Sequence, residues 1–123
     1  MYTLDTNAII YHLKGDPQAV SFFASETNTA DVFYVSTITE LELFSLPDLK
    51  VKDASDLDTF LKTTSVIPVD SRIARIAAFL RRTYRTRTAD SVIAATALFT
   101  NTPLVTRNIK DFQNINNLSL QSI

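Results

Sequence analysis

Residues 89–108 read ADSVIAATALFTNTPLVTRN, and this stretch decides the fold class. The part from about 89 to 99 is rich in Ala and lacks Gly and Pro, which predicts a helix that packs closely on a sheet. Leu104 and Val105 then predict a short buried strand, which ends at Thr106-Arg107-Asn108. A helix that leads into a buried strand is typical of α/β proteins.

The same alternation of helices and short apolar strands continues on both sides of this stretch. Strands are expected at 1–4, 32–35, 66–69 and 118–120, and helices up to Leu13, from Asp16-Pro17 onward, up to about Ser45, and at about 53–62, 70–84 and 110–112. This order predicts an α/β fold, a three-layer α/β/α sandwich around a short parallel sheet, in a single domain spanning residues 1–123.

Composition removes several classes of protein. Hydrophobic residues make up 46% and charged residues 20%, so neither a disordered chain nor a membrane protein is expected. There is no Cys, which excludes disulfides and thiolate metal sites, and no export signal is recognisable, so a cytoplasmic enzyme is expected. Gly15 is the only glycine, which excludes Gly-rich phosphate loops.

Positive charge is concentrated in one segment of the chain. The net charge is −1, yet all seven arginines lie within 72–107 and six of them within 72–87. No Asp or Glu occurs within 71–89. Such a local excess of positive charge attracts polyanions even when the whole chain is nearly neutral.

Four arginines are candidates for substrate binding. Arg82, Arg85 and Arg87 are either a solvated helix end or a surface that contacts a phosphate backbone, with Tyr84 able to stack on a base. They lead directly to an acidic position, which favours the second interpretation. Arg107 follows the strand at 104–105 and is placed to clamp a phosphate.

Four carboxylates stand where strands end or helices begin. Asp5 follows the first strand, Glu42 lies on the helix after the second strand, Asp90 is in the first turn of the Ala-rich helix, and Asp111 follows the fourth strand. In a parallel sheet all four reach the same edge, where sites of α/β proteins form. Asp5 and Asp90 also have a structural interpretation as helix caps.

Ionised carboxylates that converge in a cleft repel one another, and a cation relieves that repulsion. A set of oxygen ligands suits Mg²⁺ or Mn²⁺. Metals held in this way activate water and stabilise displacement at phosphate. The acids therefore predict metal-dependent chemistry on a phosphodiester.

Four stretches carry a family resemblance. They are LDTN at 4–7, VSTITELEL at 35–43, ADSVIAATAL at 89–98 and LVTRNIKDF at 104–112. In this order the chain resembles the PIN-domain ribonucleases, and within them the VapC-type toxins of toxin–antitoxin pairs. The resemblance implies a metal-dependent endoribonuclease that hydrolyses RNA, forms a homodimer and binds a small antitoxin protein.

The resemblance also implies site residues. Asp5, Glu42 and Asp90 match acidic metal-binding positions of the family, and Glu42 fits the motif better than the nearby Glu40. The fourth position is a departure: many members carry Asp directly after Thr-Arg, where this chain has Asn108, with Asp111 three residues later. The expected catalytic residues are thus Asp5, Glu42, Asp90 and Asp111, and Asn108 joins them as a metal ligand. The departure leaves one or two metal ions open.

Three further residues receive interpretations at this stage. Asn7 and Thr106 match family positions that orient the acids through side-chain hydrogen bonds. His12, the only histidine, lies among apolar neighbours and is expected to be a packing or surface residue rather than a catalytic one.

Other functions compete with the nuclease. A phosphoryl-transfer enzyme that forms an aspartyl phosphate would carry a second Asp at the place of Asn7, and a receiver domain would carry an acidic pair on the first strand. The main alternative is a catalytically weakened PIN scaffold that acts as an RNA- or protein-binding module, which Asn108 supports. The sequence does not distinguish the RNA target, and DNA cleavage stays open.

Overall fold

The computed structural model of the chain describes residues 1–27, 29 and 31–123. Within this part the strands form one five-stranded sheet in which every pairing is parallel: β1 (Tyr2–Leu4), β2 (Phe33–Ser36), β3 (Ser65–Ile67), β4 (Leu104–Thr106) and β5 (Leu120–Ser122). The expected parallel sheet is therefore confirmed. The last strand lies two residues later than expected.

The strand order is β3-β2-β1-β4-β5, with β1 at the centre. The chain moves from β1 to β2 and β3 on one side and then returns to place β4 on the other side of β1. The carboxyl ends of β1 and β4 therefore form a topological switch point, where α/β sheets bind ligands. Leu4 pairs with Val105, so the residues that follow them, Asp5 and Thr106, emerge side by side.

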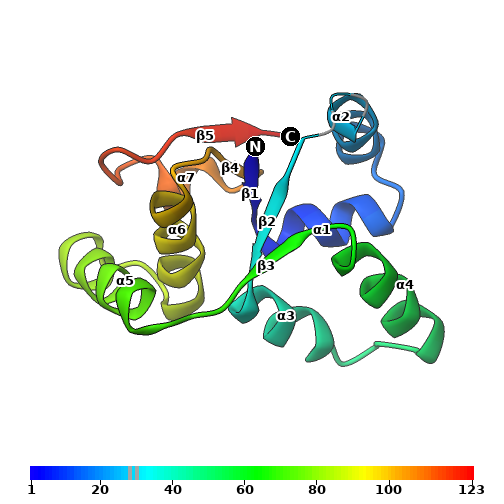
Figure 1. Cartoon of the computed structure of the whole chain (residues 1–123), viewed down its shortest axis with the longest axis horizontal. Coiled ribbons are helices and arrows are strands. Elements are labelled where there is room, and N and C mark those ends of the chain that lie inside the picture. The colour runs from blue at the N-terminus through cyan, green and yellow to red at the C-terminus, as the bar shows by residue number, and fades with distance from the viewer. Residues whose placement is uncertain (28, 30) are drawn as a thin grey trace.

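Helices cover both faces of the sheet. They are α1 (Thr6–Leu13), α2 (Pro17–Thr27), α3 (Thr37–Phe44), α4 (Val51–Leu61), α5 (Ser71–Tyr84), α6 (Thr88–Thr100) and α7 (Ile109–Phe112). Figure 1 shows α5 and α6 on one side of the sheet and α1, α2 and α4 on the other, which confirms the three-layer prediction. None of the described helices has the length and apolar character needed to cross a membrane.

Two apolar clusters hold the layers together. One lies under α5 and α6 and includes Leu104, whereas the other lies under α1, α2 and α4 and includes Leu4 and Val105. Leu104 and Val105 enter opposite clusters because successive side chains of a strand point to opposite faces. The small side chains of α6 allow close packing, and every residue from Ser91 to Ala97 is buried. The packing role expected of the Ala-rich segment is thus confirmed.

Local capping explains where several helices begin and end. Asp16 accepts a hydrogen bond from the Ala19 N–H at 3.1 Å and opens α2, and Asp70 accepts one from the Ile73 N–H at 3.0 Å and opens α5. Gly15 follows α1 with φ of +80°, a conformation that side chains disfavour. These acids satisfy backbone donors that would otherwise be unpaired.

Candidate functional site

Asp5 lies at the centre of the candidate site. It directly follows β1, and only 4% of its surface is exposed. Thr106, at the end of β4, donates a hydrogen bond from Oγ1 to Asp5 Oδ2 at 2.9 Å, and the same Oγ1 accepts one from the Asn108 N–H at 3.0 Å. Thr106 therefore orients Asp5, as the resemblance implied, and links it to the turn that carries Asn108.

The charge of Asp5 has no cationic partner within the described residues. The pKa of Asp5 is raised to about 6. Burial is the main cause and the nearby charges of Asp90 and Glu42 contribute, whereas the hydrogen bond from Thr106 partly opposes the rise. At neutral pH the protein thus holds a buried, unpaired negative charge, which a bound cation would stabilise.

Glu42 is oriented by a hydroxyl on a neighbouring helix. Thr6, the first residue of α1, donates from Oγ1 to Glu42 Oε1 at 2.6 Å, and its Oγ1 lies 3.2 Å from Thr39 Oγ1. The preference for Glu42 over Glu40 agrees with this contact. Asn7, expected to orient an acid, is exposed and makes no side-chain hydrogen bond to the described residues, so Thr6 takes the role assigned to it.

Asp90 brings a third carboxylate from the first turn of α6. Burial raises its pKa, the charges of Asp111 and Glu42 add to that rise, and Arg87 lowers it. Asp111 itself is exposed on α7. Asp90 therefore lies within electrostatic reach of the other three predicted acids, Asp5, Glu42 and Asp111, although the four come from different helices and turns.

Helix capping does not account for Asp5 and Asp90. Asp5 occupies the N-cap position of α1, yet its side chain makes no capping hydrogen bond. The described residues also contain no hydrogen-bond partner for the Asp90 side chain, whereas Asp16 and Asp70 cap their helices directly. The capping part of the structural interpretation therefore loses its support, although both acids still stand at helix N-termini, where a negative charge complements the helix dipole.

The fit to a metal ion depends on the spacing and chemistry of these donors. In the described part of the chain, no three Asp, Glu, His or Cys side chains stand close enough to hold one ion together. The donors are all oxygens, and Mg²⁺ in proteins usually keeps several waters and needs few direct carboxylate ligands. Asn108 stands at the N-cap of α7 without a capping side-chain bond, so its side-chain carbonyl is not used there. The set fits a hydrated divalent cation.

A polar cavity of about 270 Å³ opens beside the acids. It lies between the 84–87 segment and α7, and acidic and basic side chains line it together: Arg85, Arg87 and Lys110 beside Asp90 and Asp111. Lys110 was not predicted from the sequence, because a single lysine carries no recognisable spacing. A cavity with cations next to a cluster of acids can hold a phosphate at the edge of a metal site.

The other two predicted substrate-binding arginines lie outside this cavity. Arg107 donates from Nη2 to Asp16 Oδ2 at 2.7 Å and from Nε to the Ile123 carbonyl at 3.0 Å, and its guanidinium lies 4.1 Å from the centre of the Tyr11 ring. Arg107 therefore has a structural role in this structure, and the expected phosphate contact stays a prediction. Arg82 projects from α5 over the ring of Phe79.

His12 belongs to an aromatic cluster, in agreement with the packing role expected for it. Its ring centre lies 4.4 Å from that of Phe23 and 5.5 Å from that of Phe60. Burial lowers the pKa of His12, so the neutral ring is favoured.

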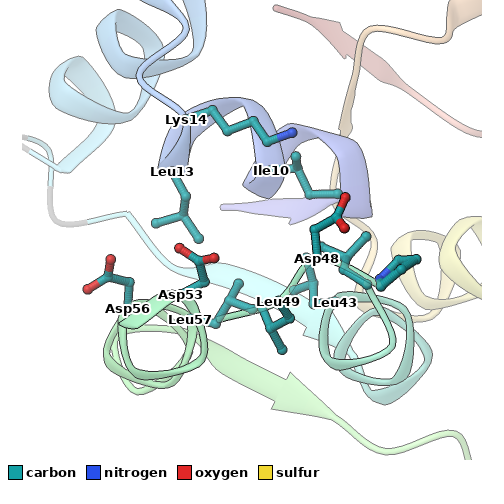
Figure 2. Close-up of a pocket in the computed structure, with 11 residues that line it drawn as sticks. Ile10, Leu13, Lys14, Leu43, Asp48, Leu49, Asp53, Asp56 and Leu57 are labelled. Carbon is teal, nitrogen blue, oxygen red and sulfur yellow. The ribbon is translucent and has the colours of Figure 1, made fainter. Parts of the chain in front are cut away.

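A second, apolar hollow of about 220 Å³ lies between α1, α3 and α4. Figure 2 shows Leu13 and Ile10 reaching from α1 toward Leu57 and Leu49, with aspartates beside them. The lining comprises Ile10, Leu13, Lys14, Leu43, Leu46, Pro47, Asp48, Leu49, Asp53, Asp56 and Leu57, and we call this set the acidic-rimmed groove.

Not all the large apolar side chains in the first half of the chain enter the core. Phe23 is buried and Phe22 and Leu49 are partly buried, but Val20, Phe44 and Leu46 remain exposed.

Comparisons with known proteins agree with this geometry. A family model for the PIN domain matches residues 2–118. Ribonuclease VapC19 of Mycobacterium tuberculosis is 30% identical over 117 residues, which cover 91% of this chain and 92% of the relative. VapBC2 from Rickettsia felis, solved bound to a DNA fragment from its promoter, matches with a TM-score of 0.85 and 28% identity, covering 99% of this chain and 98% of that one. A toxin–antitoxin complex from Klebsiella pneumoniae matches with a TM-score of 0.80 and 27% identity over all of both chains.

Proposed function

The chain belongs to the PIN-domain family, and from this premise we propose that it is a metal-dependent endoribonuclease, the toxin of a VapBC-type toxin–antitoxin pair. The observation that carries the activity is the buried, unpaired carboxylate of Asp5 beside Asp90 and Glu42 at the strand switch point. A fold does not define a function, so the geometry of the acids has to support this proposal. The RNA substrate would be met in the cytoplasm.

Mg²⁺ or Mn²⁺ would be held by Asp5, Glu42 and Asp90, with Asn108 or Asp111 completing the site, and water molecules of the ion would bridge it to those side chains that do not reach it directly. The raised pKa values of Asp5 and Asp90 support this assignment, because both carboxylates gain stability when a cation approaches. When bound, the cation supplies a water of lowered pKa and neutralises charge on the phosphate.

The side chains of the protein position the reactants. Glu42, oriented by the hydrogen bond from Thr6, would orient the attacking water or serve as a ligand of the metal. Arg85, Arg87 and Lys110, which line the adjoining cavity, would hold phosphate oxygens there. These fixed charges are placed before the reaction begins, which is the main way such sites stabilise phosphoryl transition states.

The acidic-rimmed groove is the surface we assign to the antitoxin. Its floor is apolar, as an amphipathic helix requires, and Asp48, Asp53 and Asp56 on its edge outnumber the single cation Lys14. A helix with an apolar stripe and flanking basic residues is complementary to it. The homodimer that the family resemblance implies stays a prediction.

Cleavage of RNA by the purified protein tests the proposal. Labelled total RNA is incubated with Mg²⁺, with Mn²⁺ or with EDTA, using the wild type, Asp90→Asn and, as a control, Asp58→Asn on the exposed face of α4. We expect discrete products that require metal, persist with Asp58→Asn and disappear with Asp90→Asn.

Products that are identical in wild type and Asp90→Asn would assign the cleavage to a contaminant. RNA that is bound but never cut would instead favour the alternative function, a PIN scaffold that acts as a binding module.

A further inference from the structure

Arginine and phenylalanine side chains share the outer face of α5. Arg72, Arg75, Phe79 and Arg82 follow one another at three- or four-residue intervals, which places them on one side of a helix. All four are exposed, and the opposite side of the helix packs into the core through Ile73, Ala77 and Leu80. None of these four residues belongs to the buried core.

Phe99 of α6 extends the same surface, since α5 and α6 lie side by side (Figure 1). The Arg72 guanidinium lies 4.8 Å from the centre of the Phe99 ring, and the Arg82 guanidinium lies 5.8 Å from that of Phe79. The rings are still open to solvent, with Phe79 51% and Phe99 39% exposed. Stacked arginines therefore flank two accessible aromatic rings.

We propose that these five residues, Arg72, Arg75, Phe79, Arg82 and Phe99, form a second RNA-binding site, the α5 face, which contacts single-stranded RNA away from the cut. The inference rests on the proposed ribonuclease function and names an additional surface for its substrate. Arginines would contact phosphates, and the phenylalanine rings would stack on bases, a combination that binds single strands with little dependence on sequence.

The charge of the surface favours a polyanion. No acid occurs between Ser71 and Ala89. Among the described residues, the ion pair that involves this surface joins Arg72 to Asp70 at 2.9 Å. Arg75 has no ion pair among the described residues. The positive charge of this face is therefore largely uncompensated by the protein itself.

The position of the α5 face allows it to bind the same RNA strand that enters the candidate site. α5 ends at Tyr84, and the next residues, Arg85 to Arg87, line the cavity beside Asp90. The helix rise places Arg72 about 20 Å from Arg85, a distance of a few nucleotides. An RNA seated in the cavity can therefore continue along α5.

A second copy of the chain is a less suitable occupant. A two-fold interface would place this face against itself, so the arginines of one copy would lie close to the arginines of the other. The segment contains no carboxylate within 71–89 to offset that repulsion. Phosphates relieve the charge, whereas a symmetric partner doubles it.

Binding of a fluorescent mixed-sequence single-stranded RNA, measured by anisotropy in EDTA to prevent cleavage, tests the inference. Two lengths are compared, about 2 and about 16 nucleotides, because only the longer one reaches from the cavity across the α5 face. We expect Arg75→Ala and Phe79→Ala each to weaken binding of the longer RNA by roughly five- to tenfold. Lys52→Ala, on the exposed start of α4, is the control for loss of one positive charge and should change nothing.

Salt dependence gives a readout that a folding defect would not reproduce. Arg75→Ala should reduce the slope of log affinity against log salt by roughly 0.7, while Phe79→Ala should leave the slope as it is. With metal present, both variants should raise KM for the longer RNA and leave kcat near the wild-type value.

Equal binding of the longer RNA by wild type, Arg75→Ala and Phe79→Ala would overturn the α5 face even if the protein cleaves RNA. A shift from dimer to monomer in sedimentation with Phe79→Ala, without loss of RNA affinity in Arg75→Ala, would overturn it too and assign the surface to a second copy. Failure of the ribonuclease proposal would show separately, as an absence of metal-dependent cleavage by the wild type on either RNA.

Discussion

Two aspartates near the carboxyl ends of the central strands have opposite surroundings. Asp16 accepts two hydrogen bonds from Arg107, at 2.7 and 3.3 Å, and a third from the backbone of α2. The Arg107 guanidinium, the largest influence, lowers the pKa of Asp16. Asp5 is more deeply buried, faces Asp90 and Glu42, and has its pKa raised to about 6, mainly by burial.

The difference separates a carboxylate that stabilises the fold from one that the fold must accommodate. Asp16 is charged, paired and already satisfied, so it needs no ligand. Asp5 is charged at neutral pH without a cationic partner among the described residues, which costs stability until a cation binds. Sites that work on charged substrates commonly keep such unfavourable groups, and the stability is recovered on binding.

The largest effect is expected from removing the charge of each aspartate in turn. Asp5→Asn keeps the shape of the side chain but removes a metal ligand, so kcat/KM for RNA should fall by at least about a hundredfold. Asp16→Asn removes only a structural ion pair and should change kcat/KM by less than about threefold. Initial rates at saturating Mg²⁺ measure both.

Comparable losses in the two variants would erase the distinction between the paired and the unpaired aspartate. Circular dichroism of both variants excludes unfolding as the cause.

Stability against pH is the second test, in metal-free protein. The folded state binds the Asp5 proton more tightly than the unfolded chain, whose aspartates titrate near pH 4, so this group makes the protein less stable as pH rises from about 4 to about 7. The cost at pH 7 is about 3 kcal/mol at most. In EDTA, Asp5→Asn should therefore unfold at a higher temperature than wild type at pH 7.5, and the gap should close toward pH 4.

The comparison with Asp5→Asn cancels the contributions of Asp16 and Asp70, whose lowered pKa values act in the opposite direction and at lower pH. Mg²⁺ should raise the unfolding temperature of the wild type only. A wild type that is more stable than Asp5→Asn in EDTA at pH 7.5 would contradict the raised pKa.

The surroundings of Asp5, which has no ion pair, and those of Asp16, which pairs with Arg107, are not equally predictable from the sequence. Strands and helices follow from local patterns, such as the Ala-rich run of α6 and the Asp16-Pro17 start of α2, so their order and approximate bounds were predictable. The strand order was not, because it depends on contacts between distant segments. The acids were found because Asp5, Glu42 and Asp90 stand beside strand ends and helix starts in recognisable motifs.

The sequence of a single chain does not reveal which residues, far apart in the sequence, contact each other in the fold. Arg107 was expected to bind phosphate, but its pairing with Asp16 joins residues 91 positions apart, and no local pattern indicates it. Thr6 was overlooked in favour of Asn7, its neighbour, because only the three-dimensional approach of α1 to α3 brings its hydroxyl to Glu42. Lys110 belongs to the cavity for the same reason.

The third test concerns this overlooked hydroxyl. Thr6→Val preserves the volume of the side chain but removes the hydrogen bond to Glu42, so the carboxylate loses its fixed orientation. We expect kcat/KM to fall by about tenfold, the range found for residues that orient metal ligands. Thr6→Ser should restore most of the activity, because it keeps the hydroxyl. A Thr6→Ser variant as slow as Thr6→Val would show that packing, rather than the bond to Glu42, matters at this position.

The smallest effect on activity is expected from Arg107→Lys, which alters the ion pair with Asp16. Lysine keeps one positive charge for Asp16 but cannot reproduce the planar fork that also reaches the Ile123 carbonyl and stacks on Tyr11. The unfolding temperature should fall, while kcat/KM should decrease by less than about threefold and the metal requirement should stay the same. Arg107 directly follows Thr106, which donates a hydrogen bond to Asp5. The activity of this variant therefore measures whether the ion pair with Asp16 affects the position of Asp5. A loss as large as that of Thr6→Val would mean that the ion pair at Asp16 helps to position Asp5.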